Sequence, residues 1–187
     1  YVQGVVNGSI IANPERVQGC QRFINMVESG KYDIRTGEAD FVIGFLQTAF
    51  FHRQGETLEG LSLRGTPFLL QDWQKFCIYG MLIFYYPGTI ERVVKEAFIF
   101  IPRKNGKTLL VAGIAFALAV LSRKSAAVVY VVGAALKQAK ETFASWRYNI
   151  EHKMHRDKKA AVKKGWRIAD NSFEHVVSND DFAGGAV

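Results

Sequence analysis

Residues 97–108 have the sequence AFIFIPRKNGKT. The first five are apolar, aromatic or β-branched, which predicts a short buried β-strand. Residues 102–106 predict a loop, and the apolar run from Lys107 to about Leu121 predicts a buried helix. A Gly-Lys-Thr sequence between a buried strand and a helix is an arrangement that binds phosphate groups. The chain is therefore predicted to fold around a phosphate-binding loop.

Three residues of this loop have the chemistry that phosphate binding needs. Gly106 leaves room for a nest of backbone N–H groups, Lys107 would reach the β- and γ-phosphates, and Thr108 would hold Mg²⁺. The N-terminus of the helix also favours an anion. Ile101 replaces the usual first glycine of the motif, so the alternative is a basic loop that binds no ligand. Arg103 would stabilise transition-state charge as an arginine finger does, or else lie solvated on the surface.

The sequence after the loop continues to alternate between strand and helix patterns. Residues 126–132 are mostly apolar and β-branched, which predicts a second buried strand. Apolar residues recur at helical spacing over residues 136–150, and residues 165–177 predict a hairpin. The order strand, loop, helix, strand, helix predicts an α/β fold, with a parallel sheet of the P-loop NTPase type flanked by helices.

The sequence before the loop is predicted to be mostly helical. Asn13 precedes Pro14 in a pattern typical of a helix start, and Asp72 is a candidate cap for a later helix. We therefore expect two parts, which are a helical N-terminal segment at residues 1–66 and a P-loop ATPase-like core at residues 67–187.

The composition limits the classes of protein to which the chain can belong and the kinds of partner that it can bind. The 187 residues are 49% hydrophobic, which excludes global disorder, and the net charge of +7 favours a polyanionic partner. The apolar run at residues 109–121 is shorter than the roughly 20 residues that span a bilayer, so no membrane partner is expected. Cys20 and Cys77 lie far apart in the sequence, which argues against a disulfide framework and for a reducing compartment.

A basic stretch at residues 137–167 contains ten Lys or Arg and three Asp or Glu. A protein that grips the DNA backbone without reading its sequence would use such a patch. A solvated basic face and a contact with a neighbouring subunit are the alternatives. The candidate DNA-binding residues in this stretch are Lys153, Arg156, Lys158, Lys159, Lys163 and Lys164.

Three parts of the sequence resemble a known family. Residues 101–108, IPRKNGKT, resemble the variant Walker A loop of the large terminase subunit of tailed phages, the motor that packages DNA. Residues 67–76, PFLLQDWQKF, resemble the family's segment on the adenine side of the nucleotide, which contains a Trp-Gln pair. Residues 129–139 resemble the second strand and helix of the family's ATPase domain. The resemblance therefore covers most of the chain.

The resemblance implies a role for each matching residue. Gln74 would recognise the adenine edge, Lys107 and Arg103 would act in catalysis, and Thr108 would hold Mg²⁺ on the bound ATP. The implied nucleotide-binding residues are Gln74, Pro102, Arg103, Lys104, Asn105, Gly106, Lys107 and Thr108. The family also implies an ATPase that moves double-stranded DNA into a procapsid in the cytoplasm of the bacterial host. Its implied partners are the small terminase subunit, the portal protein and further copies of itself in a homo-oligomeric ring.

Two features of the family are not found in this sequence. No run of four apolar residues ends in Asp-Glu, as the family's Walker B strand does, and no nuclease domain follows. We therefore expect an incomplete ATPase domain that by itself is weakly active or inactive and carries no nuclease activity. The alternatives are a non-catalytic basic module that binds nucleic acid, or a P-loop ATPase of helicase type.

Overall fold

The computed structural model divides the chain into two compact units, and each is described by itself. The first unit comprises Tyr1–Ile43 and Leu70–Phe100, and the second comprises Gly44–Leu69 and Ile101–Val187. The residues described are 1–57, 59–102, 105–121, 128–132, 136–171, 175–179 and 182–186. These units are defined by packing, and the functional division predicted between residues 66 and 67 stays a prediction.

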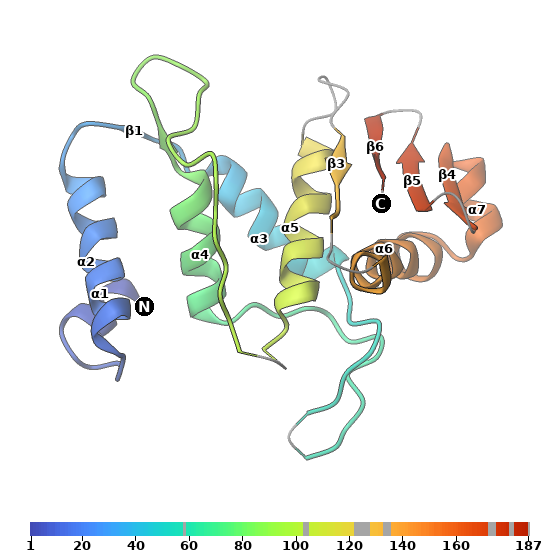
Figure 1. The fold of residues 1–187 in the computed structure, drawn as a ribbon, viewed down its shortest axis with the longest axis horizontal. Coiled ribbons are helices and arrows are strands. Elements are labelled where there is room, and N and C mark those ends of the chain that lie inside the picture. Colours follow the sequence, from blue (N-terminus) through green and yellow to red (C-terminus); the bar gives the residue numbers. More distant parts are fainter. Residues whose placement is uncertain are drawn as a thin grey trace. The chain divides into compact units, whose positions relative to one another are not determined.

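The first unit is built from helices and one small sheet (Figure 1). Its elements are α1 (Val2–Val6), α2 (Pro14–Glu28), β1 (Asp33–Ile34), the first part of α3 (Gly37–Ala49), α4 (Asp72–Leu82) and β2 (Phe84–Tyr85). β1 and β2 pair antiparallel. The rings of Phe76 and Phe84 each lie edge-on to the ring of Phe23, with centroids 5.5 Å apart. This aromatic cluster joins α2, α4 and β2 in the core of the unit.

The structure tests two predicted helix caps, one at the start of α2 and one at the start of α4. The side chain of Asn13 accepts a hydrogen bond from the backbone N–H of Arg16 at 3.1 Å, and Pro14 is the first helical residue. The predicted start of α2 is therefore confirmed. Asp72 is itself the first residue of α4 and the cap is Gln71, so the prediction that Asp72 caps this helix is wrong. Asp72 suits its actual place, because an acidic side chain in the first turn complements the helix dipole.

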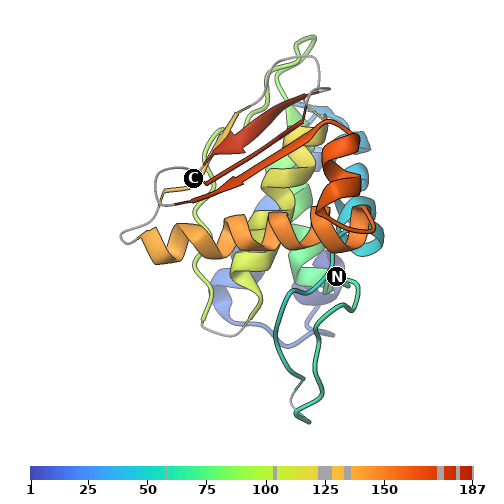
Figure 2. The same ribbon diagram turned by 90° about the vertical axis from the view of Figure 1, so that its right-hand side faces the viewer.

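The second unit contains a four-stranded sheet with helices packed against it (Figure 1, Figure 2). Its elements after α3 are α5 (Lys107–Leu121), β3 (Val129–Tyr130), α6 (Leu136–Asn149), the π-helix η2 (Ile150–Met154), α7 (Lys158–Lys163), β4 (Trp166–Asp170), β5 (His175–Asn179) and β6 (Phe182–Ala186). The strand order is β3-β6-β5-β4. β3 and β6 pair parallel, whereas β6 with β5 and β5 with β4 pair antiparallel.

Several predicted elements of this unit are confirmed. α5 has the predicted bounds, α6 begins at the predicted residue, and β4 forms the predicted hairpin with β5. The second predicted strand is present at Val129–Tyr130, and residues 126 and 127 lie outside the described residues. The fold is therefore mixed α/β, as predicted. Among the described strands only β3 and β6 pair parallel, so a parallel sheet of the P-loop NTPase type stays a proposal.

The strand predicted at residues 97–101 is not formed. The backbone described from residue 94 to 102 has no strand pairing, and the side chains of Phe98 and Phe100 are 92% and 86% exposed. Their rings stack on each other, with centroids 6.3 Å apart. The prediction of a buried strand is therefore wrong for this structure. An apolar, β-branched run favours an extended and buried chain, but a strand forms only where another strand supplies its hydrogen bonds.

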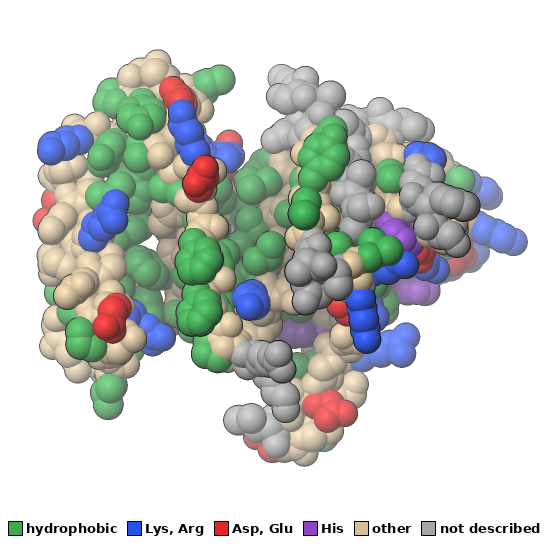
Figure 3. All heavy atoms as spheres, in the orientation of Figure 1, with side chains coloured by type: hydrophobic (Ala, Val, Ile, Leu, Met, Phe, Trp, Pro, Cys, Tyr) green, Lys and Arg blue, Asp and Glu red, His purple; other side chains and the backbone are tan. Residues whose placement is uncertain are grey.

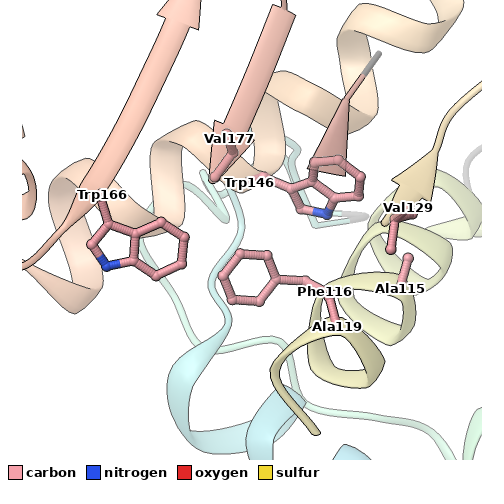
Figure 4. A pocket seen from close by; sticks show the side chains of 7 residues that line it. All are labelled: Ala115, Phe116, Ala119, Val129, Trp146, Trp166 and Val177. Atoms are coloured by element: carbon pink, nitrogen blue, oxygen red, sulfur yellow. The ribbon is translucent and has the colours of Figure 1, made fainter. Parts of the chain in front are cut away.

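The core of the second unit lies between α5, α6 and the sheet. Phe116 of α5 stacks on Trp166 of β4 with ring centroids 5.9 Å apart, and Figure 4 shows both near Trp146 of α6. The cavity that these side chains line has a volume of about 10 Å³, which is close to the space that one water molecule needs. The cavity is therefore a small gap in the core and too small for a ligand.

Candidate nucleotide-binding site

The N-terminus of α5 presents the three residues on which the phosphate prediction depends. Gly106 has a φ of +69°, a left-handed conformation that glycine adopts without strain. Its carbonyl accepts the first helical hydrogen bond, which comes from the backbone N–H of Leu110 at 2.9 Å. Lys107 and Thr108 follow in the first turn with exposed side chains. The glycine therefore turns the chain directly into the helix that carries the lysine and the threonine.

This geometry suits a phosphate group. Because Leu110 makes the first helical bond, the backbone N–H groups of residues 107–109 have no acceptor within the helix. Together with the helix dipole they favour a negative charge at this end. The ammonium group of Lys107 adds three donors, and the hydroxyl of Thr108 is an oxygen ligand of the kind that Mg²⁺ prefers. The residues present therefore fit the phosphates of a magnesium-bound nucleotide.

The loop before α5 is described in part. The side-chain amide of Asn105 donates to the carbonyl of Pro102 at 3.3 Å, which closes the loop across its base. Because proline has no backbone N–H, the main chain of Pro102 can only accept a hydrogen bond, through its carbonyl. Arg103 and Lys104 lie outside the described residues, and the roles predicted for them stay predictions.

Close packing holds α5 in place. The indole N–H of Trp146 donates to the carbonyl of Ala112 at 2.7 Å, and both residues are buried. A Cβ atom added to Gly113 would lie 2.1 Å from Cδ2 of Leu46, so a larger residue at this position would force the Leu46 side chain to move. The helix that presents Lys107 is therefore supported along its buried side.

Gln74, the predicted contact for adenine, belongs to the first unit. It is 4% exposed, and its Oε1 accepts a hydrogen bond from the backbone N–H of Gln71 at 2.8 Å. This contact satisfies a free donor at the start of α4. Phe76 packs against the rings of Tyr1 and Phe23, which is a core role. The structure thus gives Gln74 a capping role, and its contact with adenine stays a prediction.

The six candidate DNA-binding residues do not share one environment. Lys153 is half-buried. Its Nζ donates to the carbonyl of Gly65 at 3.0 Å and lies 4.6 Å from the centre of the Phe51 ring. The other five are exposed, and they are Arg156, Lys158, Lys159, Lys163 and Lys164. Lys153 is therefore engaged within the chain, whereas the other five cations lie on the surface.

A polar network that was not predicted lies beside the β4–β5 hairpin, and it is buried at one end and exposed at the other. His175 Nδ1 is 2.8 Å from Asp170 Oδ1, and Arg147 of α6 forms ion pairs with Asp170 and with Glu151. His175 and Glu151 are buried. The spacing of four between Arg147 and Glu151 is a helical ion-pair signal that could have indicated part of the network. The predicted hairpin contained Asp170 and His175 but offered no reason to connect them with α6.

We expect Asp170→Asn to destabilise the protein at neutral pH and to do so less in acid. Burial alone would raise the pKa of Asp170, but the hydrogen bonds and charges of His175 and Arg147 outweigh it and hold that pKa below its usual value. A lowered pKa contributes stability above the unfolded-state pKa of about 3.9, and this contribution is lost as the pH falls through the folded-state pKa. In urea unfolding, the stability difference between native and variant should stay nearly constant above about pH 5 and shrink below about pH 4.

The control for this prediction is the same substitution in an Arg147→Gln background. Two side chains that interact directly do not contribute additively, so Asp170→Asn should cost less stability when Arg147 is absent. An equal cost in both backgrounds would show that the ion pair does not contribute to the effect of Asp170.

A comparison with known protein families matches residues 72–182 to the family described as the ATPase domain of the terminase large subunit. The match covers more than half of the 187 residues and includes the loop, α5 and the β4–β5 hairpin. Comparisons with curated proteins and with solved structures give no match. Among the helices in the described part of the chain, none has the length and apolar character of a membrane span.

Proposed function

Because this chain belongs to the family of terminase large subunit ATPase domains, we propose that it is the ATP-binding portion of a viral DNA-packaging motor. In this role ATP hydrolysis is coupled to the translocation of double-stranded DNA into a procapsid. Mg²⁺, a homo-oligomeric ring, the small terminase subunit and the portal protein are parts of the same proposal. The observation that carries it is the N-terminus of α5, where Gly106 turns the chain at a φ of +69° into a helix that begins with Lys107 and Thr108.

Each residue of the proposed site has a separate task. Gly106 and the amides of the first turn would surround phosphate oxygens, and Lys107 would neutralise charge on the β- and γ-phosphates. Thr108 would hold Mg²⁺, which supplies further positive charge beside the phosphates when it is bound. Arg103 would stabilise the transition state, and Gln74 would recognise the adenine. Affinity would then depend mainly on the first three residues, whereas the rate and the choice of base would depend on the last two.

A second candidate function is a non-catalytic module that binds nucleic acid and whose loop only contacts phosphate. The exposed basic residues in and around α7 favour it. Such a module would bind DNA with a strong salt dependence and would be indifferent to ATP. The motor domain should instead bind ATP with Mg²⁺ in the absence of DNA. Calorimetric titration of the DNA-free protein with ATP, with and without Mg²⁺, separates the two functions.

Thr108→Val is expected to lose the part of the ATP affinity that depends on Mg²⁺. Valine matches the size of threonine but lacks the hydroxyl ligand. Affinity in the presence of EDTA should therefore be unchanged, whereas the gain on adding Mg²⁺ should be mostly lost. Thr108→Ser keeps the hydroxyl and should retain this gain. If Thr108→Val binds ATP with Mg²⁺ as tightly as the native protein, the role assigned to Thr108 is wrong.

A further inference from the structure

Helix α7 presents three lysines to solvent on one side. Its inner side is held by Ala161, which is fully buried, and the helix packs against η2 and β4. Lys158, Lys159 and Lys163 are exposed, and Val162 between them is 53% exposed. Lys159 and Lys163 are four positions apart and therefore lie one above the other on the helix, with Lys158 beside them. We call these three lysines the α7 face, and Figure 3 shows Lys and Arg side chains gathered in this part of the second unit.

The lysines of the α7 face form no ion pair within the described ranges of the chain. Lys153, in the same basic stretch, is engaged with the carbonyl of Gly65. Asp157 is the acid closest to the α7 face in the sequence, but it caps the N-terminus of α7 and pairs with Arg156. The positive charge of the α7 face is therefore left without a counter-charge from the described residues.

This arrangement weakens the helix that carries it. Like charges four residues apart on a helix repel each other, which applies to Lys159 and Lys163. α7 has six residues, and a helix of this length is not stable without support from tertiary packing. The repulsion between Lys159 and Lys163 therefore destabilises a helix, α7, that has little stability of its own. A polyanion bound to the α7 face would convert this repulsion into attraction.

We propose that the α7 face binds the phosphate backbone of duplex DNA, an inference that rests on the proposed function as a DNA-packaging motor. Duplex DNA presents closely spaced phosphates, which lysines bind as flexible point charges without reading the sequence. A single strand would instead stack its bases on aromatic rings beside the cations. Trp146 and Trp166, the two tryptophans of the basic stretch, are 2% and 8% exposed, so they are not available for stacking. A face with charge and without exposed tryptophan suits the backbone of a duplex.

The test uses the double variant Lys159→Gln, Lys163→Gln in the intact chain. Glutamine has nearly the helix propensity of lysine and removes the repulsion, so the thermal unfolding midpoint should be unchanged or slightly higher. Binding of a labelled duplex of mixed sequence is followed by fluorescence anisotropy over a series of salt concentrations. The variant should bind more weakly, and the slope of log K against log salt should become shallower by about 2, because two phosphate contacts are lost.

The matched control is Arg22→Gln, Lys31→Gln, which removes two exposed cations from the first unit. For this control variant, the slope of log K against log salt should stay close to that of the native protein. An equal change in the control would show that DNA responds only to net charge, and this would overturn the proposal. An unchanged slope in the α7 variant, no duplex binding by the native protein, or tighter binding to a single strand than to a duplex would also overturn it.

ATP affinity measured on the same samples separates this inference from the proposed function. The α7 variant should bind ATP like the native protein, because its substitutions lie outside the proposed phosphate loop, and loss of ATP binding would count against a specific role in DNA binding. If the native protein binds no ATP but its duplex binding still depends on the α7 face, the proposed ATPase site is wrong and the α7 face is supported.

Discussion

Replacing Lys107 by alanine is expected to lower the affinity for ATP by at least about tenfold, and by more if two phosphate contacts are lost. A hydrogen bond to a charged group contributes about 1.5–3 kcal/mol, and about 1.4 kcal/mol corresponds to a tenfold change in affinity. Lys107 is the first residue of α5, directly after Gly106, and its side chain is exposed. It is therefore available to a phosphate held by the amides of the first turn. Isothermal calorimetry with ATP and Mg²⁺ measures the loss.

Lys137→Ala is the matched control for this experiment. Lys137 is an exposed lysine in the first turn of another helix of the same unit, α6, and its loss lowers the net charge by the same amount. The control should bind ATP as the native protein does. Lys107→Arg should recover only part of the affinity, because a guanidinium keeps the charge but has a different shape from an ammonium group. Native affinity in Lys107→Ala would contradict the phosphate loop as the site of ATP binding.

Some features of this fold depend only on residues that lie close together in the sequence, and local sequence patterns predict these features. The cap of α2 at Asn13, the bounds of α5 and the β4–β5 hairpin are set by side chains close to each element in the chain. The candidate site also depends on neighbouring residues, because Gly106 and the two residues after it lie together at a helix start, and its phosphate binding stays a prediction.

Contacts between distant residues could not be predicted in the same way. Whether residues 97–101 form a strand depends on another strand with which to pair, and an apolar pattern carries no information about that partner. The charge of Lys153 predicts a contact with DNA, yet its ammonium group donates to the carbonyl of Gly65, 88 residues earlier in the chain. The ion pair of Arg147 with Asp170 likewise exists only because the hairpin packs near α6. A charge pattern therefore indicates which side chains are cationic. It does not indicate which of them are held by contacts within the chain and which can bind a ligand.

Replacing Asn149 by alanine is expected to destabilise the second unit by roughly 2–4 kcal/mol. The side chain is fully buried. Its Oδ1 accepts from the backbone N–H of Phe51 at 2.7 Å, and its Nδ2 donates to the carbonyls of Phe51 at 3.1 Å and of Ser145 at 2.9 Å. The amide thus pairs with Phe51 as a neighbouring β-strand would. Alanine would leave both backbone groups of the half-buried Phe51 without this partner, and a polar group left unpaired away from water costs about 1–3 kcal/mol.

Urea unfolding of Asn149→Ala and of Ser145→Ala separates this long-range pairing from an ordinary loss of a buried polar group. Ser145 lies one turn earlier on α6 and is also buried, but its hydroxyl donates to the carbonyl of Glu141 within the same helix at 3.0 Å. Its loss should cost less than about 1 kcal/mol, because that carbonyl keeps its helical partner. Asn149→Asp should be at least as damaging as alanine at neutral pH, since a carboxylate would face two carbonyl oxygens. If Asn149→Ala were no more destabilising than Ser145→Ala, the strand-like pairing with Phe51 would contribute little to stability.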